Sequence, residues 1–325
     1  MKNRLATAGL LAFLAADVAL VAAALGAGRD VAPALPTVTR TAGLTTDPAT
    51  DPQTTPQTTP RTTAPADPVT SPPRSTSSPA AKAVPATRLV TALDAATAWR
   101  ARTGSCDAGG AVVEVTNDGG ETWTRLRTPS RAVVRVQPLD EARAFVIGAG
   151  ADCTLEQYAT NDVGRTWQAP TTVSGGWARR LDEPSSVLAP QQDAAAPCGG
   201  AVVIDLARTS ASQAEALCAD GSVVVTNDGG VTWSDSGDAP GGVALSNLLV
   251  DTTLTTYAAR IVGACEGVQV VRVVEGRNAT IVACVPVRSP VRGQVGLSVT
   301  DRGGWIVSGD QTWVSVGDLT SWKRV

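Results

Sequence analysis

An eight-residue phrase, T-N-D-x-G-x-T-W, occurs three times in this 325-residue chain and constrains its fold more than any other feature. The copies span 116–123, 160–167 and 226–233, and each follows a short segment with the pattern of a β-strand. Their aspartates lie 44 and then 66 residues apart. A period in the forties, with turn signals and no helical pattern, indicates the four-stranded blades of a β-propeller.

The residue types in the phrase suit a rigid turn. An aspartate there accepts hydrogen bonds from backbone N–H groups of its own turn. Glycine adopts backbone angles that a Cβ penalises, and the tryptophan folds back over the turn. A shortened copy ends the chain with Asp318 and Trp322. The predicted structural residues of the full copies are Thr116, Asp118, Gly120, Thr122, Trp123, Thr160, Asp162, Gly164, Thr166, Trp167, Thr226, Asp228, Gly230, Thr232 and Trp233.

The strand rhythm around these phrases divides residues 88–325 into five units, so we expect an all-β propeller of five four-stranded antiparallel blades. Six or seven blades remain open. The long step between the second and third phrases contains an excess segment, residues 175–199. This segment is too short for a blade, and we expect an inserted loop.

The phrase resembles the Asp box, or bacterial neuraminidase repeat, S/T-x-D-x-G-x-T-W. Sialidases, sortilin-type receptors and photosystem-II assembly-factor-like proteins carry this box. The resemblance covers essentially all of residues 88–325. It implies a β-propeller in which each box joins the third and fourth strands of a blade, on the rim and away from the central pocket.

The sialidase branch of this resemblance implies three arginines that clamp a carboxylate and a tyrosine–glutamate nucleophile pair. The chain has two tyrosines, Tyr158 and Tyr257, and lacks the F/Y-R-I-P motif near the start of the propeller. A catalytic channel would need carboxylates and at least two arginines. The arginines considered for it are Arg88, Arg100, Arg135, Arg179 and Arg260.

We therefore expect a non-catalytic recognition or assembly module with no catalytic residue, cofactor or metal. A sialidase-like exo-glycoside hydrolase is the first alternative, and a structural envelope spacer is the second.

Cysteine usage indicates disulfides. All six cysteines lie in the propeller region, and the chain has no histidine and no CxxC pair. Neither zinc binding nor a histidine-activated thiol is expected. The two ends of one hairpin place Cys198 beside Cys218, which is the best-supported pairing. Two further candidate pairs are Cys265 with Cys284 and Cys106 with Cys153.

The N-terminal region has the pattern of an exported protein. Lys2 and Arg4 precede an apolar run, residues 5–28, whose only charge is Asp17. The run is long enough for an uncleaved membrane anchor, and a cleaved signal peptide is the alternative. Residues 29–87 form a Thr/Pro-rich segment expected to be a disordered linker. This order places the propeller outside a bacterial cytoplasm, tethered to the membrane or, after cleavage, secreted.

Charge and loop composition limit the class of partner that the propeller is expected to bind. Residues 88–325 hold 20 Lys and Arg against 25 Asp and Glu, which argues against nucleic acid. The expected partner is an envelope protein or a glycan. Within the excess segment, Trp177, Arg179 and Arg180 are a candidate exposed hot spot. The alternative is a loop that packs against its own blade.

Overall fold

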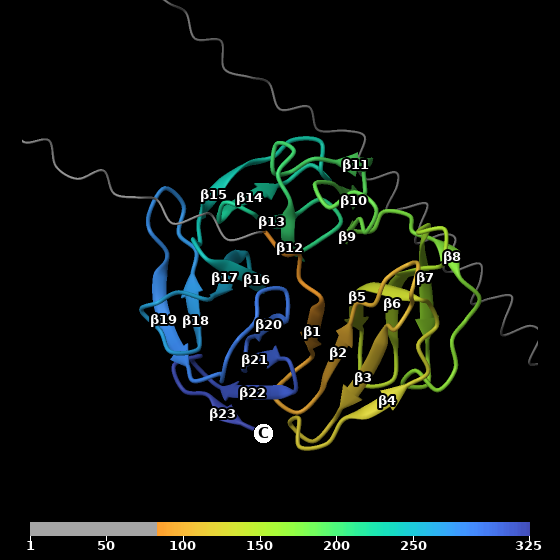
Figure 1. The fold of residues 1–325 in the computed structure, drawn as a ribbon, viewed down its shortest axis with the longest axis horizontal. Coiled ribbons are helices and arrows are strands. Elements are labelled where there is room, and N and C mark those ends of the chain that lie inside the picture. Colours follow the sequence, from red (N-terminus) through yellow and green to blue (C-terminus); the bar gives the residue numbers. More distant parts are fainter. Residues whose placement is uncertain (1–82) are drawn as a thin grey trace, which may run out of the picture. The chain divides into compact units, whose positions relative to one another are not determined.

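A computed structural model describes residues 83–325, and these fold into six antiparallel sheets arranged around a central axis (Figure 1). Five of the sheets have four strands, in the order of the chain, and one has three. The all-β propeller of four-stranded blades is confirmed. The prediction of five blades is wrong, because the structure contains a sixth sheet.

Each blade is a simple meander. Blade 1 comprises β1 (Arg88–Ala92), β2 (Ala98–Arg102), β3 (Val112–Thr116) and β4 (Thr124–Leu126). Blade 2 comprises β5 (Ala132–Pro138), β6 (Ala144–Ala149), β7 (Leu155–Thr160) and β8 (Thr171–Thr172). Blade 3 comprises β9 (Ala178–Arg179), β10 (Val187–Ala189) and β11 (Gln192–Ala195).

The second half of the ring repeats the four-stranded plan. Blade 4 comprises β12 (Val203–Arg208), β13 (Ala214–Cys218), β14 (Ser222–Thr226) and β15 (Ser234–Asp238). Blade 5 comprises β16 (Gly242–Val250), β17 (Thr253–Arg260), β18 (Val268–Arg272) and β19 (Thr280–Val285). Blade 6 comprises β20 (Val295–Thr300), β21 (Gly303–Ser308), β22 (Gln311–Val316) and β23 (Lys323–Arg324).

Blade 3 is formed by the segment predicted from the sequence to be an inserted loop. Its strands contain two to four residues, fewer than the five or six of a typical strand, so the periodicity of an individual strand is too short to recognise. Val187, Ala189 and Ala195 are nevertheless buried, at 0%, 4% and 2% exposure. The segment is therefore a full member of the ring.

The ring closes between the first and last blades without exchange of strands. Innermost strands β1 and β20 lie against each other, and the backbone N–H of Thr87 donates to Gly293 O at 2.6 Å. Farther along the same boundary, Ala92 N donates to Ser298 Oγ at 3.0 Å and Trp305 Nε1 donates to Asp94 O at 2.8 Å. Closure therefore depends on packing between blades 1 and 6 and on a few hydrogen bonds between them.

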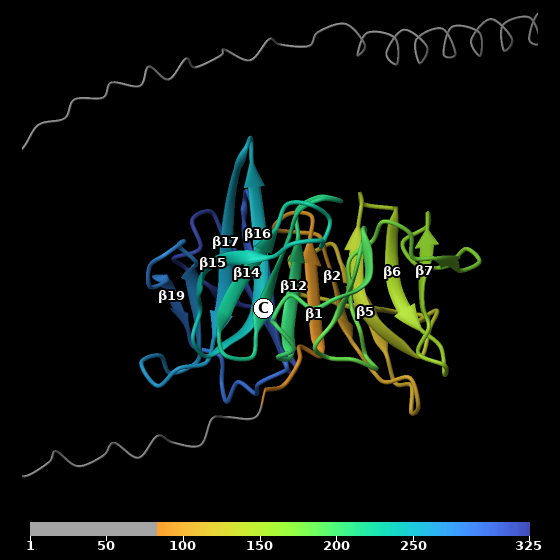
Figure 2. The ribbon, with the colours of Figure 1, turned by 90° about the horizontal axis from the view of Figure 1, so that it is seen from above.

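One hairpin is longer than the others. β16 and β17 have nine and eight residues, and Figure 2 shows them projecting beyond the neighbouring strands. Leu249 and Val250 near the tip are about half exposed.

The predicted anchor, residues 5–28, lies outside the described residues, as does nearly all of the predicted linker, residues 29–87. Within residues 83–325 no helix is long and apolar enough to cross a membrane. Residues 83–87 pack on the propeller, and Ala86 is only 1% exposed.

Candidate functional site

The T-N-D phrases form the hairpin turns between the third and fourth strands of blades 1, 2 and 4. In blade 4, Thr226 Oγ1 donates to Asp228 Oδ1 at 2.8 Å and accepts from Gly230 N at 3.1 Å. The same carboxylate accepts from the backbone N–H of Thr232 at 2.9 Å and from its hydroxyl at 2.6 Å. One aspartate therefore joins both ends of the turn.

The other copies repeat this network. In blade 1, Asp118 accepts from Thr116 at 2.7 Å and from the Thr122 hydroxyl at 2.5 Å. In blade 2, Asp162 accepts from Thr160 at 2.8 Å and from the Thr166 hydroxyl at 2.6 Å. These hydrogen bonds lower the pKa of all three aspartates to about 2, with the threonine hydroxyl after the turn as the largest cause.

The shortened C-terminal copy keeps part of the network. Asp318 accepts from the backbone N–H of Thr320 at 3.0 Å and from its hydroxyl at 2.7 Å, which lowers the pKa of the carboxyl group. Trp322 Nε1 donates to Leu319 O at 2.7 Å. All four turns lie between third and fourth strands, on the outer part of their blades, and none contributes a residue to the central cavity described below.

The tryptophans of the phrases join neighbouring blades. Each meets a buried tryptophan of the preceding blade edge to face, with ring centroids 5.9 to 6.4 Å apart. Such aromatic pairs contribute about 0.5–1.5 kcal/mol beyond their burial. The pairs are Trp123 with Trp305, Trp167 with Trp99, and Trp233 with Trp177.

The glycine two residues after the aspartate of each phrase is needed at the same contact. Gly230 has φ +97°, and a Cβ there would lie 2.5 Å from Ala189 Cβ of blade 3. Gly120 and Gly164 have φ +90° and +74° and face blade 6 and blade 1 residues in the same way. The turn therefore seals a blade against its predecessor.

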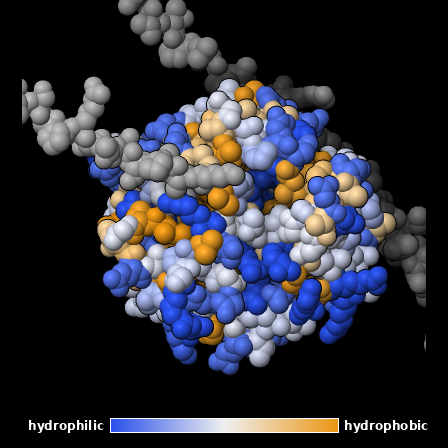
Figure 3. Space-filling view, in the orientation of Figure 1, coloured by the Kyte–Doolittle hydropathy of each residue, from blue (hydrophilic) through white to orange (hydrophobic). Residues whose placement is uncertain are grey.

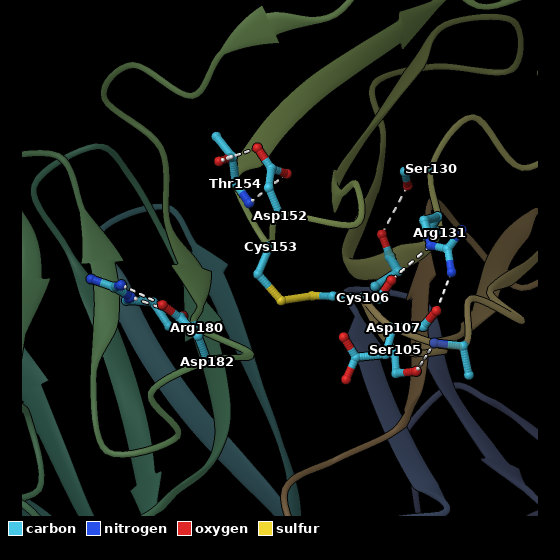
Figure 4. Close-up of a disulfide and its surroundings, with 12 residues drawn as sticks. Ser105, Cys106, Asp107, Ser130, Arg131, Asp152, Cys153, Thr154, Arg180 and Asp182 are labelled. Carbon is cyan, nitrogen blue, oxygen red and sulfur yellow. Dashed lines mark hydrogen bonds and ion pairs between the residues drawn. A yellow bond between two sulfur atoms is a disulfide. The ribbon is translucent and has the colours of Figure 1, made fainter.

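The six cysteines form three disulfides, in the pairs named from the sequence. Cys106 and Cys153, with Cα atoms 5.4 Å apart, connect the loops after the second strands of blades 1 and 2 (Figure 4). The Arg131 guanidinium donates to the carbonyls of Cys106 and Asp107 in the same region. Cys198–Cys218 and Cys265–Cys284 have Cα separations of 5.6 and 5.7 Å.

The prediction of an exposed hot spot at Trp177, Arg179 and Arg180 is wrong. Trp177 is 1% exposed and Arg179 is 7% exposed, because both belong to the start of blade 3 rather than to a loop. Trp177 Nε1 donates to Ser210 O of blade 4 at 2.9 Å. Arg180 forms ion pairs with Asp182 at 2.7 Å and Glu183 at 3.7 Å.

The central channel contains a cavity of about 270 Å³. All six innermost strands contribute to it, and these are the strands closest to the axis in Figure 1. At one end Ala86 N donates to Ile204 O at 2.8 Å, and Arg179 donates to Ala86 O. At the other end of β12 lies the exposed Arg208.

The charged residues that line this cavity are predominantly basic. They are Arg88, Arg135, Arg179, Asp205 and Arg208. Three of these arginines were considered from the sequence, whereas Arg208 was missed. Arg100 and Arg260 do not line the cavity: Arg100 pairs with Glu114 at 2.7 Å, and Arg260 donates to Gln269 at 2.7 Å.

Arg135 is held in place without a carboxylate partner among the described residues. Its guanidinium donates to Gln137 Oε1 at 3.0 Å and to Trp177 O at 3.3 Å, and it lies 5.1 Å from the centre of the Phe145 ring. Burial lowers the pKa of Arg135 to about 9, and the positive charge of Arg208 is the second cause. Partial desolvation also lowers the pKa of Arg208, although its side chain remains accessible to solvent.

Asp205 is the one described carboxylate that lines the cavity. It accepts from the backbone N–H of Leu245 at 2.9 Å. Burial raises the pKa of Asp205, and the charge of Arg179 opposes that shift. The nearby Glu215 is 1% exposed, accepts from Ser236 and Thr256, and does not line the cavity; burial raises its pKa.

A tyrosine–glutamate pair exists, but not at the channel. Tyr158 Oη donates to Glu156 Oε2 at 2.7 Å on β7, the third strand of blade 2. Burial, followed by this hydrogen bond, raises the pKa of Tyr158 to about 12. The hydroxyl is thereby made a weaker nucleophile, and neither residue lines the cavity.

A second cavity, of about 290 Å³, lies between blades 2 and 3 beside the Cys106–Cys153 disulfide. Asp152, Asp182, Asp193 and Arg180 line it. Arg180, the cation of this cavity, is paired with Asp182, and Asp152 accepts from Thr154 (Figure 4). Among residues 83–325 no cluster of His, Cys, Asp and Glu is arranged to hold a metal ion.

The face seen in Figure 3 is mostly hydrophilic, and its apolar side chains lie in several separate patches. A large continuous apolar patch is the usual mark of a protein-docking surface. This face therefore gives no reason to favour a docking patch over the channel.

The chain is similar to several solved structures at low sequence identity. No family model and no curated protein matches the chain. Among solved structures, YCF48 bound to D1 peptide has 14% identity and a TM-score of 0.39, over 69% of this chain and 91% of that one. The fucose-specific lectin from Aleuria aurantia has 10% identity and a TM-score of 0.42, over 74% and 95%. The α-L-arabinofuranosidase from Podospora anserina has 9% identity and a TM-score of 0.38, over 74% and 89%.

Proposed function

We propose that this chain is a non-catalytic recognition module of the cell envelope that binds its ligand at the central channel. The observation that carries the proposal is the convergence of four arginines and one aspartate on one cavity, in a propeller whose overall charge is negative. Isolated charges are costly to bury, so an excess of cations in a cavity favours an incoming anion.

The disulfides support an oxidising location, in agreement with the exported organisation expected from residues 1–28. The tether itself remains part of this proposal. A propeller held outside the membrane on a linker presents its channel to glycans and proteins of the envelope.

A glycoside hydrolase is the second candidate, because Asp205 shares its cavity with arginines and burial raises its pKa. Most glycoside hydrolases use two carboxylates that flank the scissile bond. The described residues supply one to the cavity, and Glu215, which is hydrogen-bonded by the lining residue Asn247, does not itself line it. This arrangement favours binding over hydrolysis.

A capture experiment tests the proposal. Full-length protein with an N-terminal tag is incubated with envelope extract of its source, alongside Arg208→Glu and the matched control Arg277→Glu, which changes an exposed arginine in the β18–β19 turn. Wild type and R277E should retain the same material, and R208E should lose it. Equal retention by all three proteins, or by none, contradicts recognition at the channel. Release of free sugar by the wild type would favour the hydrolase.

A further inference from the structure

Blade 4 contains a carboxyl group that does not belong to the channel. Glu215 lies on β13, and it is the least exposed carboxylate among the described residues. None of the ion pairs formed within residues 83–325 includes it. A buried charge without a counter-charge is costly. A carboxyl group at this position therefore needs either strong hydrogen bonds or a proton.

The hydrogen bonds of Glu215 cross the boundary between blades 4 and 5. Ser236 Oγ, on β15 of the same blade, donates to Glu215 Oε1 at 2.8 Å. Thr256 Oγ1, on β17, donates to Glu215 Oε2. The side chain of Asn247, on β16, also donates to this carboxylate. Thr256 and Asn247 belong to blade 5, so one carboxyl group joins two blades.

The pKa of Glu215 is set by burial and hydrogen bonds rather than by neighbouring charges. Burial raises this pKa, and the hydrogen bonds from Thr256, Ser236 and Asn247 oppose the shift without cancelling it. Strands β14 and β16 contain no charged residue. The charged or titratable residues on the other strands around β13 are Asp205 and Arg208 on β12, Asp235 and Asp238 on β15, Tyr257 and Arg260 on β17, and Arg272 on β18.

The two protonation states of Glu215 place different demands on the boundary. A hydroxyl group both donates and accepts, so Ser236 and Thr256 can turn to accept from the O–H of a neutral carboxyl group. An ionised Glu215 has no counter-charge to compensate for the water that it has lost. It can regain hydration only if β13 separates from blade 5. Ionisation therefore opposes the closed boundary, and protonation favours it.

We propose that Glu215 is a pH-sensitive latch between blades 4 and 5: the neutral carboxyl group holds the blades together, and its ionisation loosens them. Asn247 also lines the channel cavity, so the state of the latch reaches the channel wall. The latch requires no ligand. Its failure in the experiments below would leave the recognition proposal standing, and a failed capture experiment would leave the latch standing.

Thermal unfolding of the full-length protein as a function of pH tests the latch. The folded pKa of Glu215 lies above the unfolded value near 4.5. Its contribution to stability is therefore complete below about pH 4.5 and is lost as pH rises through the folded pKa. Glu215→Gln keeps the size of the side chain but cannot ionise. The unfolding temperature of E215Q should equal that of the wild type near pH 4 and exceed it by more than about 2 °C at pH 8.

The matched control is Glu141→Gln, which changes an exposed glutamate in the β5–β6 turn of blade 2. The difference in unfolding temperature between E141Q and the wild type should not depend on pH. Parallel curves for E215Q and the wild type from pH 4 to pH 8 would overturn the proposal. A pH-dependent difference of the same size for E141Q would also overturn it.

A second pair of variants leaves Glu215 in place. Thr256→Val removes a donor to the carboxylate, whereas Thr256→Ser keeps the hydroxyl group. Loss of this donor should raise the folded pKa of Glu215 further, so the loss of stability should extend to higher pH in T256V than in T256S. Identical pH dependence of the two variants would contradict the role given to the contact between the blades.

Hydrogen–deuterium exchange locates the opening. Protection factors of β13 and β17, corrected for the intrinsic effect of pH, should be lower at pH 8 than at pH 5 in the wild type. Those of β2 and β6, in blades 1 and 2, should change less, and E215Q should keep its protection at pH 8. An equal change in all four strands, or the same change in E215Q, would overturn a latch at this boundary.

Discussion

Blade 3 and blade 4 are neighbours in the ring, yet they are built in different ways. Blade 4 has four strands of five or six residues and a turn closed by Asp228. Blade 3 has three strands of two to four residues and no such turn. Its buried residues form one cluster with Val203, Ala214 and Ala216 of blade 4. The short sheet therefore buries its apolar side chains together with those of its neighbour.

The contact between blades 3 and 4 contains a pair of tryptophans, as do two other contacts between neighbouring blades. Trp99 and Trp305, from the second strands of blades 1 and 6, each meet the tryptophan of the next T-N-D turn. Blade 3 supplies Trp177 from just before its first strand and makes the same contact with Trp233. Trp305 and Trp177 also donate to equivalent first-turn carbonyls, Asp94 O and Ser210 O. Blade 3 therefore makes the same tryptophan contact as blades 1 and 6, although its own sheet is shorter.

The largest expected effect comes from removing the side chain of Trp177. Trp177→Ala should destabilise the protein by about 3–5 kcal/mol, the range for a buried large-to-small aromatic change. Chemical denaturation measures the effect, with Leu188→Ala, a partly buried change in the same blade, as the comparison. A loss of no more than about 1 kcal/mol for W177A would mean that blade 3 is only peripheral.

The next largest effect is expected from removal of the disulfide that follows blade 3. Cys198–Cys218 closes a loop with a sequence separation of 20 residues, and the chain-entropy relation gives about 3 kcal/mol for its loss. Cys106–Cys153, with a separation of 47, gives about 4 kcal/mol by the same relation and joins two complete blades. The double-alanine variants C198A/C218A and C106A/C153A, unfolded in urea, measure both. Protease cleavage within residues 176–199 should increase in C198A/C218A alone, and equal cleavage in both variants would contradict a special role of this bridge in blade 3.

A smaller effect isolates the turn that blade 4 has and blade 3 lacks. Thr226→Val keeps the shape of the side chain but removes the acceptor for the buried Gly230 N–H. An unsatisfied buried donor costs about 1–3 kcal/mol. The control Thr124→Val changes an exposed threonine and should stay within about 0.5 kcal/mol of the wild type. Equal effects of the two variants would show that the network in the turn is not stabilising.

The smallest effect is the dependence of stability on pH. The folded pKa values of Asp118, Asp162 and Asp228 are lowered to about 2, below the unfolded value near 3.8. Their contribution is therefore complete above about pH 4 and is lost as pH falls toward 2. Thermal unfolding of the triple Asn variant should lose less stability than the wild type over that interval. Parallel curves for the two proteins would contradict the assignment.

The sequence contained enough to locate the four-stranded blades but not the short one. Repeated turns carry a strong local signal, because Asp228 and its equivalents need fixed neighbours at fixed spacing. Blade 3 has no such turn, and its longest strand has four residues, so the only signals were the long step between repeats and the presence of Trp177. Because residues 175–199 were interpreted as a loop, that tryptophan was expected to be exposed.

The residues of the central channel were harder to predict from the sequence than blade 3. Arg135 and Arg208 are 73 positions apart and belong to the innermost strands of different blades. Nothing in the local pattern distinguishes them from surface arginines. They meet only because the ring brings the first strands of all blades together. The prediction of five blades omitted one of these strands. Among the disulfides, Cys198–Cys218 was predicted from the two ends of one hairpin, and the other two pairs were candidates that the structure contains.

The central claim is that residues 176–199 form a blade that completes a ring around a basic channel. Hydrogen–deuterium exchange of the native full-length protein tests it most directly. The amides of β10 and β11 should exchange slowly, within about ten-fold of those in β13 and β14. Exchange of residues 187–195 at the rate of an exposed loop, such as the tip of the β16–β17 hairpin, would contradict it.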